Sequence, residues 1–101
     1  MRKTVVTLSL MITCSTALMA DGKTLYKNCA GCHGDNGQTK ALHLSKAIAG
    51  QSSTKTVKQL NAYKKGQLNA YGLGNIMKTQ AETLSDSDIK ALAKYIETLK
   101  K

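Results

Sequence analysis

The clearest pattern of apolar and polar positions lies at the C-terminal end of the chain. Apolar side chains recur there every three or four residues: Ile89, Leu92, Ala93, Ile96 and Leu99. This spacing marks one face of an α-helix. Just ahead of it, Ser85 and Asp88 have the spacing of a capping box, in which each side chain bonds the other residue's backbone N–H. We therefore predict a helix that begins after Ser85.

A second helix is predicted over residues 54–65. Val57, Leu60 and Tyr63 fall three residues apart, and Gly66 suits the position just past a helix end. Ser53 or Thr54 would cap its beginning.

Two shorter segments also have helical character. Residues 23–28 place Leu25 and Tyr26 as packing positions behind Asp21, a residue type that caps helices. Residues 41–48 fit a short helical turn. Because no stretch shows the sustained alternation of a β-strand, we predict an all-α domain.

An eight-residue phrase is written twice, as QLNAYKKG over 59–66 and QLNAYGLG over 67–74. This period is too short for a stacked repeat architecture, which needs about 20–50 residues. The first copy ends the helix at 54–65. In the second copy Gly72 and Gly74 each weaken a helix by about 1 kcal/mol, so we predict a loop.

The first twenty residues differ from the rest. Met1, Arg2 and Lys3 form a basic start, residues 4–18 are uncharged and mostly apolar, and Ala20 precedes the first acidic residue. This is the layout of a secretory signal peptide. A membrane anchor is the alternative, but the run is shorter than the ~20 apolar residues of a spanning helix. We predict a cleaved signal peptide over 1–20 and one domain over 21–101, exported to the periplasm without stable membrane insertion.

The composition of residues 21–101 sets two further expectations. Thirteen lysines stand against six acidic residues, a formal net charge of +7, and the segment holds two Cys, two His, one Met and no Pro, Trp or Phe. So short a domain usually needs a disulfide, a metal or another internal staple. The positive field would attract acidic partners, whereas nucleic acid is not expected because no binding motif is present.

The staple is predicted by Cys29-Ala30-Gly31-Cys32-His33, a C-x-x-C-H pattern. This is the attachment pattern of c-type haem, in which two thiols add to the vinyl groups and the adjacent histidine binds iron. A disulfide between the cysteines would close only a very small loop, and a thioredoxin-like redox pair needs a βαβ context. A zinc site would need His43 as a fourth ligand, and the usual spacing is absent. The pattern favours one covalently attached haem c.

Haem iron has a second axial position, for which the chain offers several candidates. Met77 is the one methionine of residues 21–101 and follows a glycine-rich segment. A thioether ligand raises the reduction potential relative to two nitrogen ligands. His43, a lysine or an open position are the alternatives. With Met77 as the ligand, the second copy of the phrase would be a strap that carries Tyr71 and Leu73 past the haem and delivers Met77 to the iron.

Several segments in this order resemble a family: DGKTLYKNCAGCHGDNG, AIAGQ, the lone methionine and LSDSDIKALAKYI. The chain resembles small class I cytochromes c with one haem, of the bacterial cytochrome c-553 type. The resemblance implies three to five helices around one covalently bound haem, with the N- and C-terminal helices crossing. Gly22 and Tyr26 would pack there against Leu92 and Tyr95. It also implies iron ligation by His33 and Met77, and electron transfer.

With both axial positions filled, iron has no place for a substrate. We therefore expect a soluble periplasmic electron carrier and not an enzyme. It would act as a monomer with redox proteins that present acidic docking patches, such as an oxidase, a peroxidase or a dehydrogenase. Lys78, beside Met77, would lie near the exposed haem edge. The alternative is a haem protein with a labile sixth site that binds ligands or acts as a peroxidase.

Overall fold

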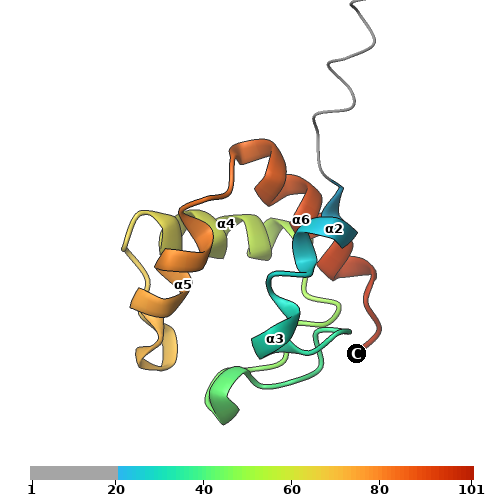
Figure 1. Ribbon diagram of the computed structural model, residues 1–101, viewed down its shortest axis with the longest axis horizontal. Helices are drawn as coiled ribbons and strands as arrows, with labels where there is room; N and C mark the ends of the chain where they lie inside the picture. Colours follow the sequence, from blue (N-terminus) through green and yellow to red (C-terminus); the bar gives the residue numbers. More distant parts are fainter. Residues whose placement is uncertain (1–20) are drawn as a thin grey trace, which may run out of the picture.

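A computed structural model describes residues 21–101 of the protein. The predicted signal peptide, residues 1–20, lies outside the described residues. Over 21–101 the chain forms five α-helices and two 3-10 turns and contains no β-strand (Figure 1). The elements are α2 (Gly22–Tyr26), α3 (Ala30–His33), η2 (Ala41–His43), α4 (Ser53–Lys64), η3 (Ala70–Gly72), α5 (Gly74–Ala81) and α6 (Asp86–Thr98). The predicted all-α class is confirmed.

Helix α6 begins as its sequence predicts. The Asp88 backbone N–H donates to the Ser85 hydroxyl at 3.1 Å, and the Ser85 N–H donates to the Asp88 carboxylate at 3.1 Å. The predicted apolar face is buried at Ile89, Leu92, Ala93 and Ile96. Leu99 is half-buried and follows the end of the helix.

The core is a small cluster centred on α6. Ile89 and Leu92 are each only 1% exposed, so they form its most enclosed part. The buried members of the cluster are Tyr26, Leu60, Ile89, Leu92 and Ile96. They come from α2, α4 and α6, and α6 contacts both of the other helices while α4 also contacts α5. The first half of the chain and the middle of the chain are therefore joined through α6.

Helices α2 and α6 cross in direct contact (Figure 1). The Tyr26 and Tyr95 rings lie 5.4 Å apart and are tilted by 50°. At Gly22 the two backbones come so close that a Cβ atom would overlap the carbonyl oxygen of Ala91 and lie 2.6 Å from Tyr95 Cβ. The expected crossing of the terminal helices is confirmed, and only glycine fits at this point.

Helix α4 starts one residue earlier than predicted. Ser52, and not Ser53 or Thr54, is the cap, because its hydroxyl accepts from the Lys55 N–H at 3.3 Å. The helix ends at Lys64, one residue before the predicted end, and Gly66 has a φ of 73°. A left-handed residue of this kind suits glycine just past a helix.

The shorter predicted segments are helical over fewer residues than expected. Helix α2 ends at Tyr26, not at 28, and Asp21 caps it by accepting from the Thr24 N–H at 2.8 Å. Residues 41–48 contain only the single turn η2, where Leu42 and His43 have φ values of 51° and 62°. These positive φ values end the helical path because a Cβ atom strains a left-handed backbone.

The doubled phrase folds in two different ways. The first copy is the last part of α4, where the Asn61 side chain donates back to the Val57 carbonyl at 3.0 Å. The second copy is mostly loop with the turn η3, and its equivalent Asn69 accepts from the Gly74 N–H at 2.8 Å. The predicted loop ends earlier than expected, because α5 begins at Gly74 and continues to Ala81.

Of the residues that the structure describes, none belongs to a helix with both the length and the apolar character needed to cross a bilayer.

We predict that Gly22→Ala weakens the crossing of α2 and α6. The added Cβ meets backbone at Ala91, which cannot move without shifting a helix, so overpacking should lower the free energy of unfolding by about 1–3 kcal/mol. Denaturant unfolding of the haem-loaded protein measures this change. Gly31→Ala is the matched control, because no atom lies within 4 Å of a Cβ at that position. Equal stability of the two variants would contradict the close approach at Gly22.

A second prediction concerns alkaline stability. The Tyr26 hydroxyl donates to the Gly34 carbonyl at 2.6 Å, and burial raises the pKa of Tyr26 from 10 to about 12. A raised pKa stabilises the fold fully below pH 10, and this stability is lost as pH rises through about 12. Tyr26→Phe should cost about 1 kcal/mol at neutral pH through the lost hydrogen bond. It should also flatten the decline in stability above pH 10. Urea unfolding at a series of pH values tests both effects, with the exposed Tyr71→Phe as control.

Candidate haem site

Helix α3 is a single turn that gathers the C-x-x-C-H residues. It begins after Cys29, whose carbonyl oxygen accepts from the N–H groups of Cys32 at 3.2 Å and His33 at 3.0 Å. Residues spaced by three and four positions share one side of a helix, so Cys29, Cys32 and His33 project in related directions. The two cysteines are not joined in a disulfide.

The chemical states of these side chains suit attachment and ligation. Cys29 is half-buried, and burial, with a smaller contribution from Cys32, raises the pKa of its thiol. Burial lowers the pKa of the His33 imidazole, which keeps the ring neutral and its lone pair available at neutral pH. Cys32 is exposed.

One nitrogen of His33 tests whether the site fits a metal-bound group. Among residues 21–101, His33 Nδ1 is the single buried side-chain nitrogen or oxygen without a hydrogen-bond partner. A buried polar atom left unpaired costs about 1–3 kcal/mol. The His33 ring is neutral and half-buried, and one of its nitrogens has no hydrogen-bond partner, so the ring can still form another bond. His33 therefore fits an iron ligand.

Met77 lies on α5, a helix that the sequence analysis did not predict. The loop of the second copy stops at Leu73, and the Met77 N–H donates to the Leu73 carbonyl at 3.1 Å within the first turn of α5. Met77 is half-buried and packs against the core cluster. The polar residues Asn75 and Thr79 lie on the exposed side of the same helix, so they leave Met77 free to pack inward.

Cys29 and Met77 meet at one cavity of about 170 Å³. Its other lining residues are mainly apolar and come from every long element of the fold: Leu25, Asn28, Leu60, Gln80, Ala81, Thr83, Leu84 and Leu92. In Figure 1, α5 lies to the left of α3 and α4 runs above both, so Cys29, which precedes α3, and Met77 of α5 come from separate parts of the fold. This apolar cavity between a thiol and a thioether is smaller than a haem and is not lined by Cys32 or His33, so it fits only one apolar edge of such a group.

The other histidine is placed differently. His43 is exposed and belongs to η2, which contacts α3, the helix that carries His33. Within residues 21–101, no three side chains of His, Cys, Asp or Glu gather as ligands for a metal ion. The zinc alternative therefore receives no support from the described part of the chain.

Sequence reasoning missed part of the cavity wall. Neither helix α5 nor the contribution of Leu84 to the cavity wall was predicted. The signal for α5 was present, because Leu73, Met77 and Ala81 recur every four residues. This helix was not predicted because Gly72 and Gly74, in the second copy of the phrase, favoured a loop.

Comparison with known proteins agrees with this site. The family model described as Cytochrome c matches residues 19–100. Cytochrome c-553 of Helicobacter pylori strain J99 is 41% identical over 100 residues, covering 99% of this chain and 100% of the relative. Cytochrome c-553 of Nitratidesulfovibrio vulgaris strain Miyazaki F is 35% identical over 85 residues, covering 84% and 82%. Cytochrome c-554(547) of Halothiobacillus neapolitanus is 39% identical over 89 residues, covering 80% and 96%.

The family match spans nearly all of residues 21–101, and the helices, the paired thiols and the apolar cavity agree with it. The chain therefore belongs to the cytochrome c family, with the small class I fold, and it is a haem-based electron carrier that holds one covalently bound haem c.

Proposed function

We propose that this protein is a periplasmic electron carrier whose haem iron is ligated by His33 and Met77. Cys29 and Cys32 form the two thioether bonds. The observation that carries the proposal is the shared cavity, in which Cys29 of the segment leading into α3 and Met77 of α5 line the same apolar space. Haem supplies a one-electron change at iron, and the chain supplies the attachment, the ligands and the apolar surroundings.

His33 and Met77 divide the ligation between two separate elements. His33 is held in α3 by the backbone bond to Cys29, and Met77 is held in α5, which packs against α4. His43 is a poorer candidate for the second ligand, because it is exposed and its turn contacts the helix of the first ligand. Two ligands from the protein leave no position for a substrate, which favours electron transfer over catalysis.

Export is supported by the sequence of residues 1–20, with its basic start and uncharged apolar run. Covalent haem also suits a small domain, because it adds a large apolar body to a core with few buried side chains.

The choice of partners is supported by charge. Lys78 pairs with Glu82 at 2.8 Å, and this is the one salt bridge found within residues 21–101. Residues 21–101 keep a formal net charge of +7, because thirteen lysines stand against six acidic residues. Acidic patches on a respiratory oxidase, peroxidase or dehydrogenase would be attracted to this field, and the attraction would weaken as salt screens it.

We expect Met77→Ala to remove the far-red iron–sulfur absorption band of the ferric protein and to lower the reduction potential, because a thioether stabilises reduced iron. Ile76→Ala is the matched control, since Ile76 is the exposed neighbour on the same helix. Spectra and a redox titration of protein purified from the periplasm measure both effects, and a mature chain that starts at Asp21 would also check export. An unchanged band would exclude Met77 as the ligand. Ready CO binding by the reduced wild-type protein would favour the labile sixth site.

The charge proposal predicts opposite salt effects on two small redox reagents. Electron exchange with anionic ferricyanide should slow as ionic strength rises, whereas exchange with a cationic cobalt ammine complex should accelerate. Stopped-flow measurements at several salt concentrations give the two slopes. Slopes of the same sign, or no slope, would argue against docking through a positive field.

A further inference from the structure

Helix α5, which carries Met77, is too short to fix its own first turn. It has eight residues, a rise of about 12 Å, and isolated helices of this length are marginal in water. Leu73, the residue before it, makes no side-chain hydrogen bond to the first turn. The order of the first turn therefore has to come from a residue farther along the chain.

Asn69 supplies this order from five residues before the helix begins. Its side-chain oxygen accepts from the N–H of Gly74, the first residue of α5, at 2.8 Å. Its backbone carbonyl accepts from the Gly72 N–H at 3.2 Å, so one residue is bonded both to the turn η3 and to the helix. The turn η3 contacts α5 and lies at the end where the helix begins (Figure 1). Residues 69–74 thus form a closed loop, named here the Asn69–Gly74 clasp.

Close packing makes the clasp depend on glycine at residue 74. Gly74 is buried, and a Cβ atom there would overlap the Leu68 carbonyl oxygen and lie 2.8 Å from Asn69 Cα. The backbone of Gly74 is not left-handed, so its conformation alone does not require glycine. The requirement is one of space, because the start of α5 lies directly against the backbone of residues 68 and 69.

The position of Met77 follows from the start of the helix. Met77 comes three residues after Gly74, about 4.5 Å along the helix axis. Its N–H donates to the carbonyl of Leu73, inside the loop that Asn69 closes. Packing against α4 holds α5 from the side, and the clasp opposes unwinding of its first turn.

We propose that Asn69 is a positioning residue for the second axial ligand. By keeping the first turn of α5 wound, it keeps the Met77 thioether at the iron and resists its replacement by other ligands. The proposal rests on Met77 as the ligand. Asn61, which has the same position in the first copy of the doubled phrase, provides a matched comparison, because its side chain bonds only to the Val57 carbonyl within α4.

The test adds imidazole to the ferric, haem-loaded protein, because imidazole binds the iron only when Met77 has left it. Asn69→Ala should bind imidazole about tenfold more tightly than wild type, the factor expected from loss of a helix cap. Hydrogen exchange of the Gly74 amide should accelerate by a similar factor. Asn69→Asp keeps an acceptor oxygen and should restore both values, and Asn61→Ala should match wild type.

A second variant, Gly74→Ala, separates the clasp from helix propensity. Alanine forms helices better than glycine, so propensity alone would tighten α5 and weaken imidazole binding. The clasp predicts the opposite result, because the added Cβ atom pushes against Asn69 and Leu68. Weaker imidazole binding by Gly74→Ala would contradict the proposal.

Equal imidazole affinity of Asn69→Ala and Asn61→Ala would overturn the positioning role, and so would a failure of Asn69→Asp to restore the wild-type affinity. Met77→Ala is measured alongside. If it keeps the far-red band, the assignment of Met77 as ligand is wrong and the role of Asn69 is overturned with it. If it loses the band while Asn69→Ala behaves as Asn61→Ala, Met77 is the ligand and the clasp alone is refuted.

Discussion

The burial of one face of α6 is the constraint on which the rest of the structure depends. Ile89 and Leu92 are almost fully enclosed, and the helices that enclose them are α2 and α4. Helix α2 leads directly into the turn that carries Cys29, Cys32 and His33, while α4 packs against the helix that carries Met77. The C-x-x-C-H turn and α5 therefore need no direct contact with each other, because each is positioned by a helix that packs against α6.

This arrangement explains how a domain with so few buried side chains positions a large cofactor. Contacts that exclude any Cβ, as at Gly22, set the angle between α2 and α6 by backbone contact. A second contact lies just past His33, the proposed iron ligand, where the buried Tyr26 hydroxyl donates to the Gly34 carbonyl. At the far end of α4, the Lys64 ammonium donates to the Leu84 carbonyl and so connects that helix to the segment ahead of α6.

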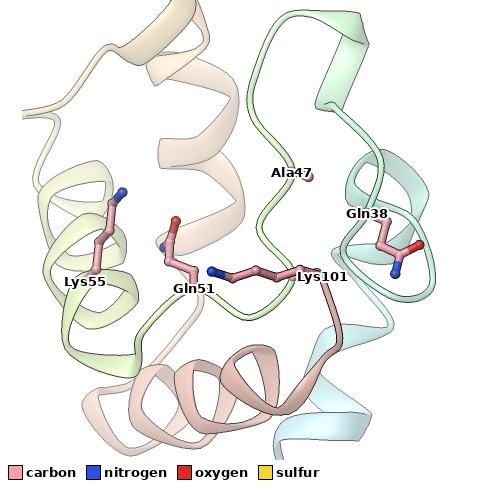
Figure 2. Close-up of a pocket in the computed structure, with 6 residues that line it drawn as sticks. Gln38, Ala47, Gln51, Lys55 and Lys101 are labelled. Atoms are coloured by element: carbon pink, nitrogen blue, oxygen red, sulfur yellow. The ribbon is translucent and has the colours of Figure 1, made fainter.

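Features determined by neighbouring residues could be predicted from the sequence. The capping box at Ser85 and Asp88, the glycine at 66 and the C-x-x-C-H turn all depend on spacings of three to seven residues. Helix α5 could not be predicted so directly, because its first residue is Gly74 and its start is stabilised by Asn69. The proximity of Gln38, Gln51 and Lys101 (Figure 2) could not be predicted either, because these residues come together only when the chain folds.

The two copies of the doubled phrase also show that a local sequence does not by itself determine the local structure. The Asn61 side chain donates to a carbonyl of its own helix. Asn69 has the same position in the phrase, but its side chain accepts from the N–H of Gly74, the first residue of the next helix. The copies differ at two residues, Gly72 and Leu73 against Lys64 and Lys65, and the residues on either side of them differ as well. In the second copy Gly72 adopts a φ of 72°, a left-handed conformation that a continuous helix does not contain.

The left-handed backbone at Leu42, His43 and Tyr71 has a consequence for motion. All three residues lie in the turns η2 and η3, and non-glycine residues in this conformation cost about 1–2 kcal/mol each. Leu42 and Tyr71 are also about half exposed, so little packing opposes their rearrangement. Conformational adjustment is therefore cheapest at these two turns and most expensive at α6. The molecule is rigid where its helices meet and compliant where its two short turns lie, which allows local change without loss of the core.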